Sequence, residues 1–386
     1  MKPDTNRINI VFWTDTLRCG GRERQFSELV SGLVRTGRAE KENLAVISMD
    51  HAGHFDEAIQ EAGVRIVRVL RKCRWDPFLP VRARKVLKEL QPDVVFSISE
   101  MASFYALVTP KRRGVRVIDG SIRNAFPVRG LKERALNWFN FRAADLVVAN
   151  SKAGLRAKNA PPAKSAVLYN GFDFNRLKDL SSPGAVKQQL GIRASRVVGM
   201  VGSFSDTKDW DSFLMAAQIL HRTDPDVCFV CAGGGEHLQA YRGRFGTQEH
   251  LRFTGCRKDV ESLIGAFDIG VLCANAEEGT PNAVMEYMAS GVPAIVAARG
   301  AVGELVDDGF TGFIIRPRDP QAVAQKIACL LADPGAAKAM GLRGQHRIRE
   351  RFSMEKALDT LMHICASVHD GAGVDRCRPC CPRLGD

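Results

Sequence analysis

Short apolar segments alternate with segments of helical periodicity along the chain, and this alternation occurs twice. In the first half the apolar segments occupy residues 8–13, 43–49, 64–69, 92–98, 115–119 and 144–150. In the second half they occupy residues 196–203, 227–235, 251–256, 268–274, 292–297 and 312–317. Apolar strands that alternate with helices form parallel sheets covered on both faces. The pattern therefore predicts an α/β fold of two doubly wound, Rossmann-like domains.

The two halves meet at a segment of low helix and strand propensity. Asn170-Gly171 is a turn signal, and SSPGA follows at 181–185. Ligands of doubly wound sheets bind beyond the carboxyl ends of the strands, so two such domains facing each other predict a central cleft. We expect four parts: a first domain over 1–172, a second over 173–349, a C-terminal helix at about 350–369 that packs back on the first, and a disordered tail over 370–386.

Composition and charge narrow the class of protein. Hydrophobic residues make up 45% and charged residues 25% of the chain, as in soluble globular proteins. No apolar run approaches a membrane span, and the chain enters a strand without a signal-peptide pattern, which favours a cytoplasmic protein. The net charge of +12 lies in the first half: residues 1–173 hold 30 Lys and Arg against 18 Asp and Glu, and the remainder holds 25 of each. This half is either a solvated basic surface or the part that meets an anionic partner.

Cysteine and histidine give little support for a metal site. Cys228, Cys231 and Cys273 lie in apolar strand-like runs, where reduced thiols behave as small hydrophobes. The tail contains Cys377, Cys380 and Cys381, a single C-x-x-C that favours a frayed terminus over a zinc site. The eight histidines are scattered. The sequence therefore predicts no metal site.

The segment EEGTPNAVMEYMASGVPAIV, residues 277–296, places two carboxylates around the start of a helix. The pattern predicts a loop over 275–280 and a helix over about 281–289, with Thr280 as N-cap and Pro281 at the first helical position. The free N–H groups at this end favour an anion, especially a phosphate. Glu278 could simply complement the helix dipole and Glu286 could be solvated, but apolar neighbours of Glu286 favour a buried site.

Glu278 and Glu286 form an E-x7-E pattern that resembles the signature of retaining GT-B glycosyltransferases of family 4, the glycosyl transferases group 1. Further segments match this family in order along nearly the whole chain: GGRER (20–24), VVANS (147–151), YNGFD (169–173), VGSFSDTKDW (201–210), CAGGGEH (231–237), FTGCRKDV (253–260), GELVDDGFTGFIIRPRD (303–319) and RERFSMEKAL (349–358). One such segment would be weak evidence, whereas the ordered set is specific.

The resemblance implies a GT-B fold and transfer of a hexose or N-acetylhexosamine from a nucleoside diphosphate sugar. UDP is the first expected nucleotide and GDP the second. The acceptor is expected to be a saccharide or a lipid-linked saccharide in cell-surface polysaccharide, lipopolysaccharide or glycolipid synthesis. The family implies no metal and no other cofactor.

The resemblance also implies roles for individual residues. Lys208 is expected to stabilise the leaving diphosphate, where negative charge develops. Glu278 is expected to hold sugar hydroxyls, and Glu286 the ribose hydroxyls. The other expected donor-binding residues are Gly20, Gly21, Ser203, Arg257, Gly279, Thr280, Pro281 and Asn282.

Two positions depart from the family pattern. Ser203 stands where an arginine is common, so Lys208 must do more or another arginine must enter. The segment 117–126 has no histidine where many members carry one near the sugar, and Asp119 and Arg123 are the candidates to replace it. A surface role for Arg123 is equally consistent with the residues.

Two segments of the basic half, 70–85 and 128–146, mix Arg and Lys with Trp, Phe and Leu. This composition suits contact with an anionic membrane at the inner face of the cell membrane, although a helix that packs on its own sheet explains 128–146 as well. Nucleic acid is not expected, because the sequence has none of the usual binding patterns. The alternatives to a transferase are a nucleotide-sugar-binding scaffold, suggested by Ser203 and the missing histidine, and a GT-B nucleotide-sugar epimerase.

Overall fold

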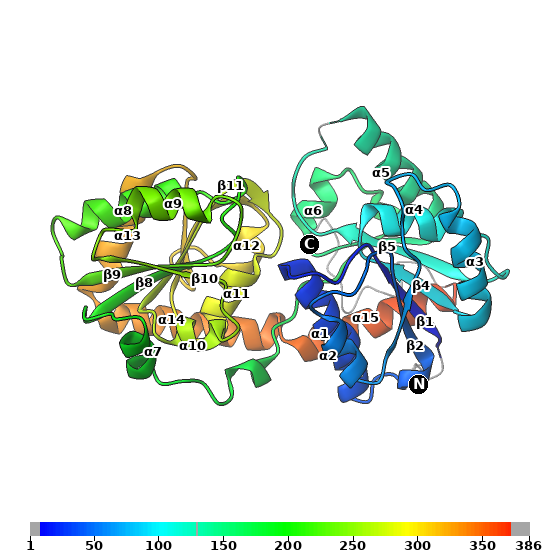
Figure 1. The fold of residues 1–386 in the computed structure, drawn as a ribbon, viewed down its shortest axis with the longest axis horizontal. Helices are drawn as coiled ribbons and strands as arrows, with labels where there is room; N and C mark the ends of the chain where they lie inside the picture. The colour runs from blue at the N-terminus through cyan, green and yellow to red at the C-terminus, as the bar shows by residue number, and fades with distance from the viewer. Residues whose placement is uncertain (1–7, 129, 372–386) are drawn as a thin grey trace. The chain divides into compact units, whose positions relative to one another are not determined.

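A computed structural model describes residues 8–128 and 130–371. The chain forms two compact units, shown in Figure 1. Unit 1 comprises the residues up to Gly171 together with those from Met354, and unit 2 comprises Phe172–Ser353. The expected tail with Cys377, Cys380 and Cys381 lies outside the described residues.

Unit 1 is built on a parallel sheet of seven strands in the order β3-β2-β1-β4-β5-β6-β7. Alternate residues of β1 enter different apolar clusters: Ile10 and Phe12 belong to one, Val11 and Trp13 to the other. Successive strand side chains point to opposite faces, so the sheet is buried on both sides. The strands are β1 (Ile10–Thr14), β2 (Leu44–Ser48), β3 (Arg65–Arg68), β4 (Val94–Ser97), β5 (Arg116–Ile122), β6 (Leu146–Ala149) and β7 (Ser165–Val167).

Helices cover both faces of this sheet (Figure 1). One cluster takes apolar residues from α1, α2 and α15, and the other from α3, α4 and α5. The C-terminal helix α15 therefore completes the core of unit 1. The helices are α1 (Gly21–Arg35), α2 (Asp56–Glu61), α3 (Leu79–Leu90), α4 (Glu100–Val108), α5 (Leu131–Ala143), α6 (Lys152–Ala157) and α15 (Met354–His369), with short 3-10 turns η2 (Lys41–Asn43) and η3 (Pro162–Lys164).

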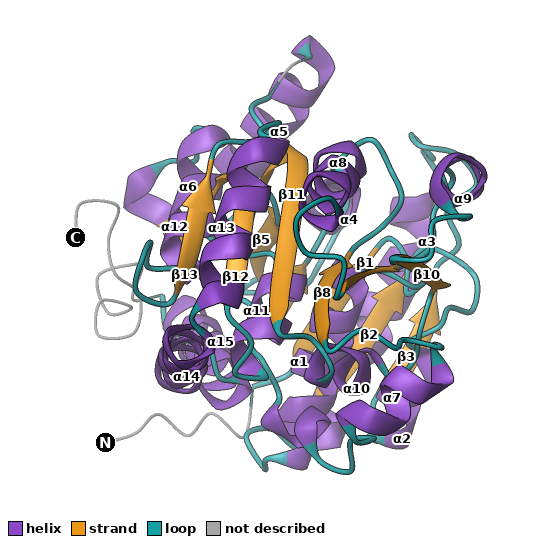
Figure 2. Ribbon diagram, turned by 90° about the vertical axis from the view of Figure 1, so that its left-hand side faces the viewer, coloured by secondary structure: helices purple, strands orange, loops and turns teal. Residues whose placement is uncertain are grey.

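Unit 2 is built on a parallel sheet of six strands in the order β10-β9-β8-β11-β12-β13. Figure 2 shows β11, β12 and β13 side by side, with helices packed over them. The strands are β8 (Arg196–Val201), β9 (Val227–Ala232), β10 (Leu251–Gly255), β11 (Ile269–Glu278), β12 (Ala294–Gly300) and β13 (Gly312–Ile315). The helices are η4 (Phe174–Leu177), α7 (Pro183–Gln189), α8 (Trp210–His221), α9 (Leu238–Phe245), α10 (Val260–Gly265), α11 (Asn282–Ala289), α12 (Val302–Leu305), α13 (Pro320–Ala332) and α14 (Pro334–Arg351).

The predicted α/β class and the two Rossmann-like sheets are confirmed. The short strand β7, which pairs with β6, was not predicted from the sequence. One local prediction is wrong. The strand predicted to end near Ala274 continues to Glu278, because Glu277 and Glu278 pair with β12 after an irregularity that follows Cys273.

Candidate active site

The two carboxylates of the E-x7-E pattern lie on either side of the turn from β11 to α11. Glu278 is the last residue of β11 and pairs with Gly300 of β12. Gly300 has a φ of +94°, and a Cβ atom there would lie 2.1 Å from the Glu278 carbonyl oxygen. Only glycine fits this close approach without strain. Gly300 therefore fixes where the backbone of Glu278 lies at the carboxyl edge of the sheet.

Lys208 and Glu278 form a close ion pair at this edge. The Lys208 Nζ donates to Glu278 Oε1 at 2.5 Å, and each side chain is 16% exposed. Lys208 precedes α8, and its backbone forms an isolated bridge with Ala274 of β11. The structure thus brings together two residues that the sequence places 70 positions apart.

Glu286 lies inside α11 and is buried, with a side chain 5% exposed. Its Oε1 accepts a hydrogen bond of 2.7 Å from Arg176 Nη2, and the same guanidinium also contacts Glu261 of α10. Arg176 belongs to η4, close to the start of unit 2. A buried carboxylate needs a partner of opposite charge, so the solvated interpretation of Glu286 is wrong.

The start of α11 differs from the sequence prediction. The helix begins at Asn282 with Pro281 as N-cap, and no side chain caps it. Thr280 is therefore not the N-cap; it is buried, as is Gly279 before it. Tyr287 anchors the helix, because its hydroxyl accepts from Val201 N at 2.7 Å and donates to the Val271 carbonyl at 3.2 Å.

Ser203 and Arg257 occupy other loops at the carboxyl edge of the unit 2 sheet. Ser203 Oγ lies 2.9 Å from Ser205 Oγ, so an exposed row of hydroxyls replaces the arginine common in the family. Arg257 is held by Asp259 through two hydrogen bonds and by Gln189 Oε1 at 2.9 Å. Its guanidinium is therefore oriented from two sides.

In unit 1, Gly20 and Gly21 lie at the start of α1. Gly20 is the N-cap in an extended conformation, and its carbonyl accepts from Arg24 N. A Cβ atom on Gly20 would lie 2.3 Å from Glu23 Oε2, so this position leaves room for the Glu23 carboxylate. Gly21 is the first residue of the helix, and the next residue, Arg22, bonds to Glu23 through Nε and Nη2.

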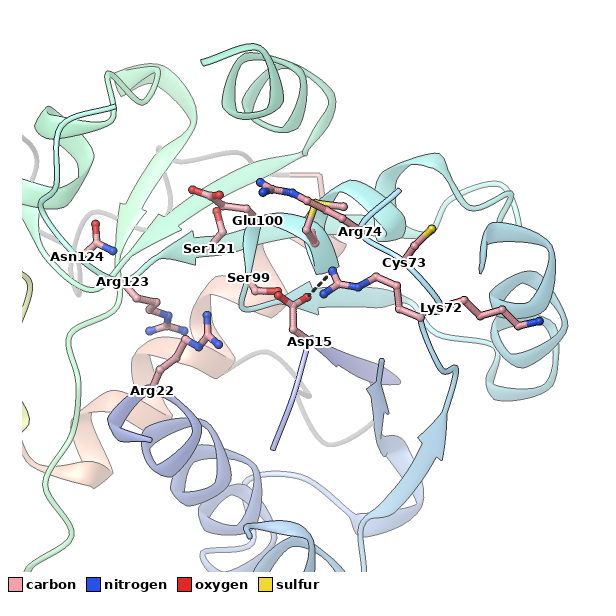
Figure 3. A pocket seen from close by; sticks show the side chains of 12 residues that line it. Asp15, Arg22, Lys72, Cys73, Arg74, Ser99, Glu100, Ser121, Arg123 and Asn124 are labelled. Atoms are coloured by element: carbon pink, nitrogen blue, oxygen red, sulfur yellow. Dashed lines mark ion pairs between the residues drawn. The ribbon is translucent and has the colours of Figure 1, made fainter. Parts of the chain in front are cut away.

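A cavity of about 690 Å³ opens at the carboxyl edge of the unit 1 sheet, and Arg22 and Arg123 line it (Figure 3). Burial, followed by the nearby Arg22 cation, lowers the pKa of Arg123 to about 10, so the guanidinium stays charged at neutral pH. Asp119 does not line the cavity. It is fully buried in β5, where its Oδ1 accepts from Ser103 Oγ and Ser121 N, and burial raises its pKa. Arg123 can therefore contact a ligand directly, whereas Asp119 lies behind the cavity wall.

Two sequence profiles match the chain and together span most of it. The profile described as Glycosyltransferase Family 4 matches residues 19–176, and the profile described as Glycosyl transferases group 1 matches residues 195–333. The chain belongs to the GT-B glycosyltransferases of family 4. It is a glycosyltransferase, and the GT-B fold expected from the sequence is confirmed by its two units.

Relatives of this glycosyltransferase include enzymes with different donors. A GDP-mannose-dependent alpha-(1-6)-phosphatidylinositol monomannoside mannosyltransferase of Mycolicibacterium smegmatis is 26% identical over 85% of this chain and 90% of its own length. A UDP-Gal:alpha-D-GlcNAc-diphosphoundecaprenol alpha-1,3-galactosyltransferase of Escherichia coli is 24% identical over 72% of this chain and 76% of its own length. The crystal structure of Anabaena HepE in complex with UDP and glucose superposes with a TM-score of 0.80 at 20% identity, covering 94% of this chain and 100% of HepE.

Sequence reasoning missed several charged residues of the glycosyltransferase that the fold brings to these edges. Arg176, Asp15 and Arg71 were not predicted as site residues, although Arg176 holds Glu286 and the other two line the unit 1 cavity. The available signal was positional: Asp15 directly follows β1, and Arg71 comes shortly after β3.

One group of side chains in the described residues has the spacing to hold a cation. Atoms of Asp206, Glu236 and His237 lie within 4.8 Å of one another, and His237 Nε2 is 2.9 Å from Asp206 Oδ1. The two carboxylates are exposed, and exposed acidic groups are common without an ion. We assign no metal to them.

Proposed function

We propose that the chain is a retaining glycosyltransferase that moves a hexose or N-acetylhexosamine from a UDP-sugar to a saccharide or lipid-linked acceptor. The observation that carries this proposal is the arrangement of Glu278 and Glu286 on either side of the start of α11. Each carboxylate has a cation fixed against it: Lys208 for Glu278 and Arg176 for Glu286.

Lys208 supplies the main positive charge for the leaving diphosphate in this proposal. Charge that develops on phosphate oxygens is stabilised best by cations already held in place. The ion pair with Glu278 holds the Lys208 ammonium beside the carboxylate that would bind sugar hydroxyls. The N–H groups at the start of α11 add favourable partial charge. We propose that no metal ion takes part, so activity should persist in EDTA.

The ribose is proposed to hydrogen-bond to Glu286. An ionised carboxylate only accepts hydrogen bonds, and two vicinal hydroxyls can donate to its two oxygens. Arg176 donates a hydrogen bond to this buried carboxylate and so fixes its orientation. The Arg257 side chain, held by Asp259 and Gln189, would lie beside the base.

UDP is proposed as the nucleotide because HepE binds UDP and glucose and the Escherichia coli relative uses UDP-Gal. The mycolicibacterial relative uses GDP-mannose, which makes GDP the second candidate. The names of both relatives describe lipid-linked acceptors. These names support a role in cell-surface polysaccharide, lipopolysaccharide or glycolipid synthesis.

We further propose that unit 1 makes peripheral contact with anionic lipids at the inner face of the cell membrane. Helices α3 and α5 flank α4, and they expose Val81 at 68%, Leu131 at 83% and Trp138 at 67%. Phe78, just before α3, is 69% exposed. Basic residues accompany these apolar side chains, as in interfacial segments. None of the helices in residues 8–128 and 130–371 has the length and hydropathy of a membrane span. Salt-sensitive flotation with vesicles containing phosphatidylglycerol tests this contact; equal flotation with phosphatidylcholine vesicles would contradict it.

The central test is donor turnover. UDP-glucose, UDP-galactose, UDP-N-acetylglucosamine and GDP-mannose are offered with membrane lipid extract, and nucleotide release and product mass are measured. We expect one UDP-sugar to be consumed and the anomeric configuration of the product, read by NMR, to match the donor. An inverted product contradicts the retaining mechanism. Nucleotide binding without turnover of any donor would favour the scaffold, and conversion to an epimer the epimerase.

A further inference from the structure

The unit 1 cavity is strongly cationic. Its lining holds five basic side chains against two acidic ones, Asp15 and Glu100. Burial raises the pKa of Glu100, and the Lys158 cation opposes this shift. The five basic residues are Arg22, Arg71, Lys72, Arg74 and Arg123.

These cations come from three loops at the carboxyl edge of one sheet. Arg22 opens α1, which follows β1; Arg71 lies in the segment after β3; and Arg123 follows β5 directly. Figure 3 shows the guanidinium groups of Arg22 and Arg123 pointing toward one another, while Lys72 extends away from them. Since parallel strands end at the same edge, the topology rather than local sequence gathers this charge.

The buried donors at this cavity are incompletely satisfied within the described part of the chain. The Nε of Arg123 and the Nη1 of Arg71 are both buried without a hydrogen-bond partner there. Arg71 Nη1 forms an ion pair with Asp15 Oδ1 at 3.9 Å, a distance too long for a hydrogen bond. Arg22 already has the Glu23 carboxylate, so Arg123 is a guanidinium at this cavity that lacks an anion among the described residues. A cation held among protein atoms without an anion is costly.

We infer that this cavity binds a phosphoryl group of the acceptor, with Arg123 and Arg71 as its principal ligands. The inference rests on the proposed function, since it names the class of acceptor: a saccharide that carries a phosphate monoester or a phosphodiester. A guanidinium presents several N–H donors in a planar fork that fits phosphate oxygens. The oxygens of a hydroxyl-only acceptor can also accept hydrogen bonds, but they bring no negative charge to offset the guanidinium. The cavity volume of about 690 Å³ is within the range of ligand pockets.

The inference is tested by calorimetric titration of the full-length chain in saturating UDP, so that donor phosphate subsites are filled. The probes are inorganic diphosphate, glycerol 3-phosphate and hexyl phosphate. We expect wild type to bind at least one probe. Arg123→Gln should raise the dissociation constant of that probe on the order of tenfold to a hundredfold, because a charge-assisted hydrogen bond is lost. Arg71→Gln, on another loop, should weaken it as well.

Arg113→Gln is the matched control, because Arg113 is exposed and precedes β5 at the opposite edge of the same sheet. It removes one positive charge without touching the cavity and should leave binding unchanged. Circular dichroism verifies that each variant is folded. Arg123→Lys should recover part of the affinity, because it restores the charge but not the planar fork.

The outcomes distinguish a soluble from a lipid-linked phosphate, and they test the acceptor inference separately from the proposed function. Binding of all probes points to a soluble phosphorylated saccharide, and binding of hexyl phosphate alone points to a lipid-linked one; both support the inference. The inference is overturned if wild type binds none of the probes, or if Arg123→Gln and Arg71→Gln bind them as tightly as wild type does. UDP binding and donor turnover measured on the same samples report on the proposed function, so that function can stand when the acceptor inference fails.

Discussion

The carboxyl edges of the two sheets carry charge in different ways. In unit 2 the acids and cations are matched: Lys208 lies against Glu278, and Arg176 lies against both Glu261 and Glu286. In unit 1 the cavity gathers five basic side chains against two acids, and Arg123 has no ion pair among the described residues. Both units have the same architecture, so the fold does not impose this difference. The matched edge offers carboxylates to the hydroxyls of the proposed donor and Lys208 to its diphosphate, whereas the unmatched cationic edge offers mainly positive charge and so suits an anion.

Breaking the Lys208–Glu278 pair should give the largest effect. Lys208→Ala removes the proposed cation at the leaving diphosphate and should lower kcat by about 10²–10³-fold, the usual cost of one preorganised stabilising group. Nucleotide release from the preferred UDP-sugar measures it. Lys338→Ala, an exposed lysine of α14, is the control and should retain full activity. Unchanged turnover in Lys208→Ala would remove this residue from the mechanism.

Loss of Arg176, the cation shared by Glu261 and Glu286, should lower both the free energy of unfolding and the affinity for the nucleotide. Arg176→Met leaves Glu261 and Glu286 buried side by side without their shared cation, which should cost about 3 kcal/mol. Hydrogen exchange resolved by segment should show faster exchange in unit 2 and little change in unit 1. Adding Glu261→Gln removes one of the two carboxylates and should recover part of the loss. If the single variant were as stable as wild type, the pair would have no structural role.

In unit 1 the loop that carries Arg71 should depend on Asp76. This buried carboxylate accepts from the Lys72 and Phe78 amides and from Arg82, and these bonds, the Lys72 amide first, lower its pKa to about 2. Asp76→Ala should cost about 2 kcal/mol, because two backbone donors and a guanidinium lose a charged acceptor. Faster exchange of the Lys72 and Phe78 amides would show it. Glu57→Ala changes an exposed acid of α2 and should leave both the stability and the exchange of these amides unchanged.

Lowering the pH should reduce the stability of unit 2 through His250, and this is the smallest of the expected effects. His250 stacks on His221 in unit 2 at 3.9 Å between ring centroids, and burial, then His221, lowers the pKa of His250 to about 4. Its unfolded value is about 6.5, so the unfolded chain takes up the proton first as pH falls. Its contribution to stability is complete above pH 6.5 and decreases between pH 6.5 and about 4.

His250→Gln should therefore reduce the fall in Tm of unit 2 between pH 7 and pH 4.5. We expect a difference of about 2–4 °C, measured by thermal unfolding at both pH values. Replacement of the exposed His51 in unit 1 is the control and should not change the pH dependence. The idea fails if His250→Gln and wild type lose the same Tm on acidification.

The sequence predicted what depends on local pattern. The strands around Phe12 or Val271 are apolar runs whose burial on both faces follows from their composition, so both sheets were predictable. The pairing of Glu278 with Gly300 was not, because it depends on a partner in another strand. The three-residue β7 is too short for a periodic signal and exists through its pairing with β6.

In the candidate site, too, some residues were predictable from local sequence and others depend on distant partners. Glu278, Glu286 and Lys208 stand in recognisable segments, whereas the bond from Arg176 to Glu286 joins residues 110 positions apart. The charge excess of the first half was readable as a count, but its concentration in one cavity was not. Strand order decides which loops become neighbours, and composition carries no information on strand order.

The return of α15 to unit 1 has a consequence for how the protein is made. Met354, Leu358 and Leu361 of this helix belong to the core cluster that also contains β1 and α1. Unit 2 is continuous in sequence and can close as soon as Ser353 has left the ribosome, whereas unit 1 starts first and finishes last. At about 5–20 residues per second, synthesis of unit 2 takes on the order of ten to forty seconds. Throughout that interval the apolar residues of β1 and α1 that pack with α15 lack this helix, so the core of unit 1 can be completed only after all of unit 2 has been synthesised.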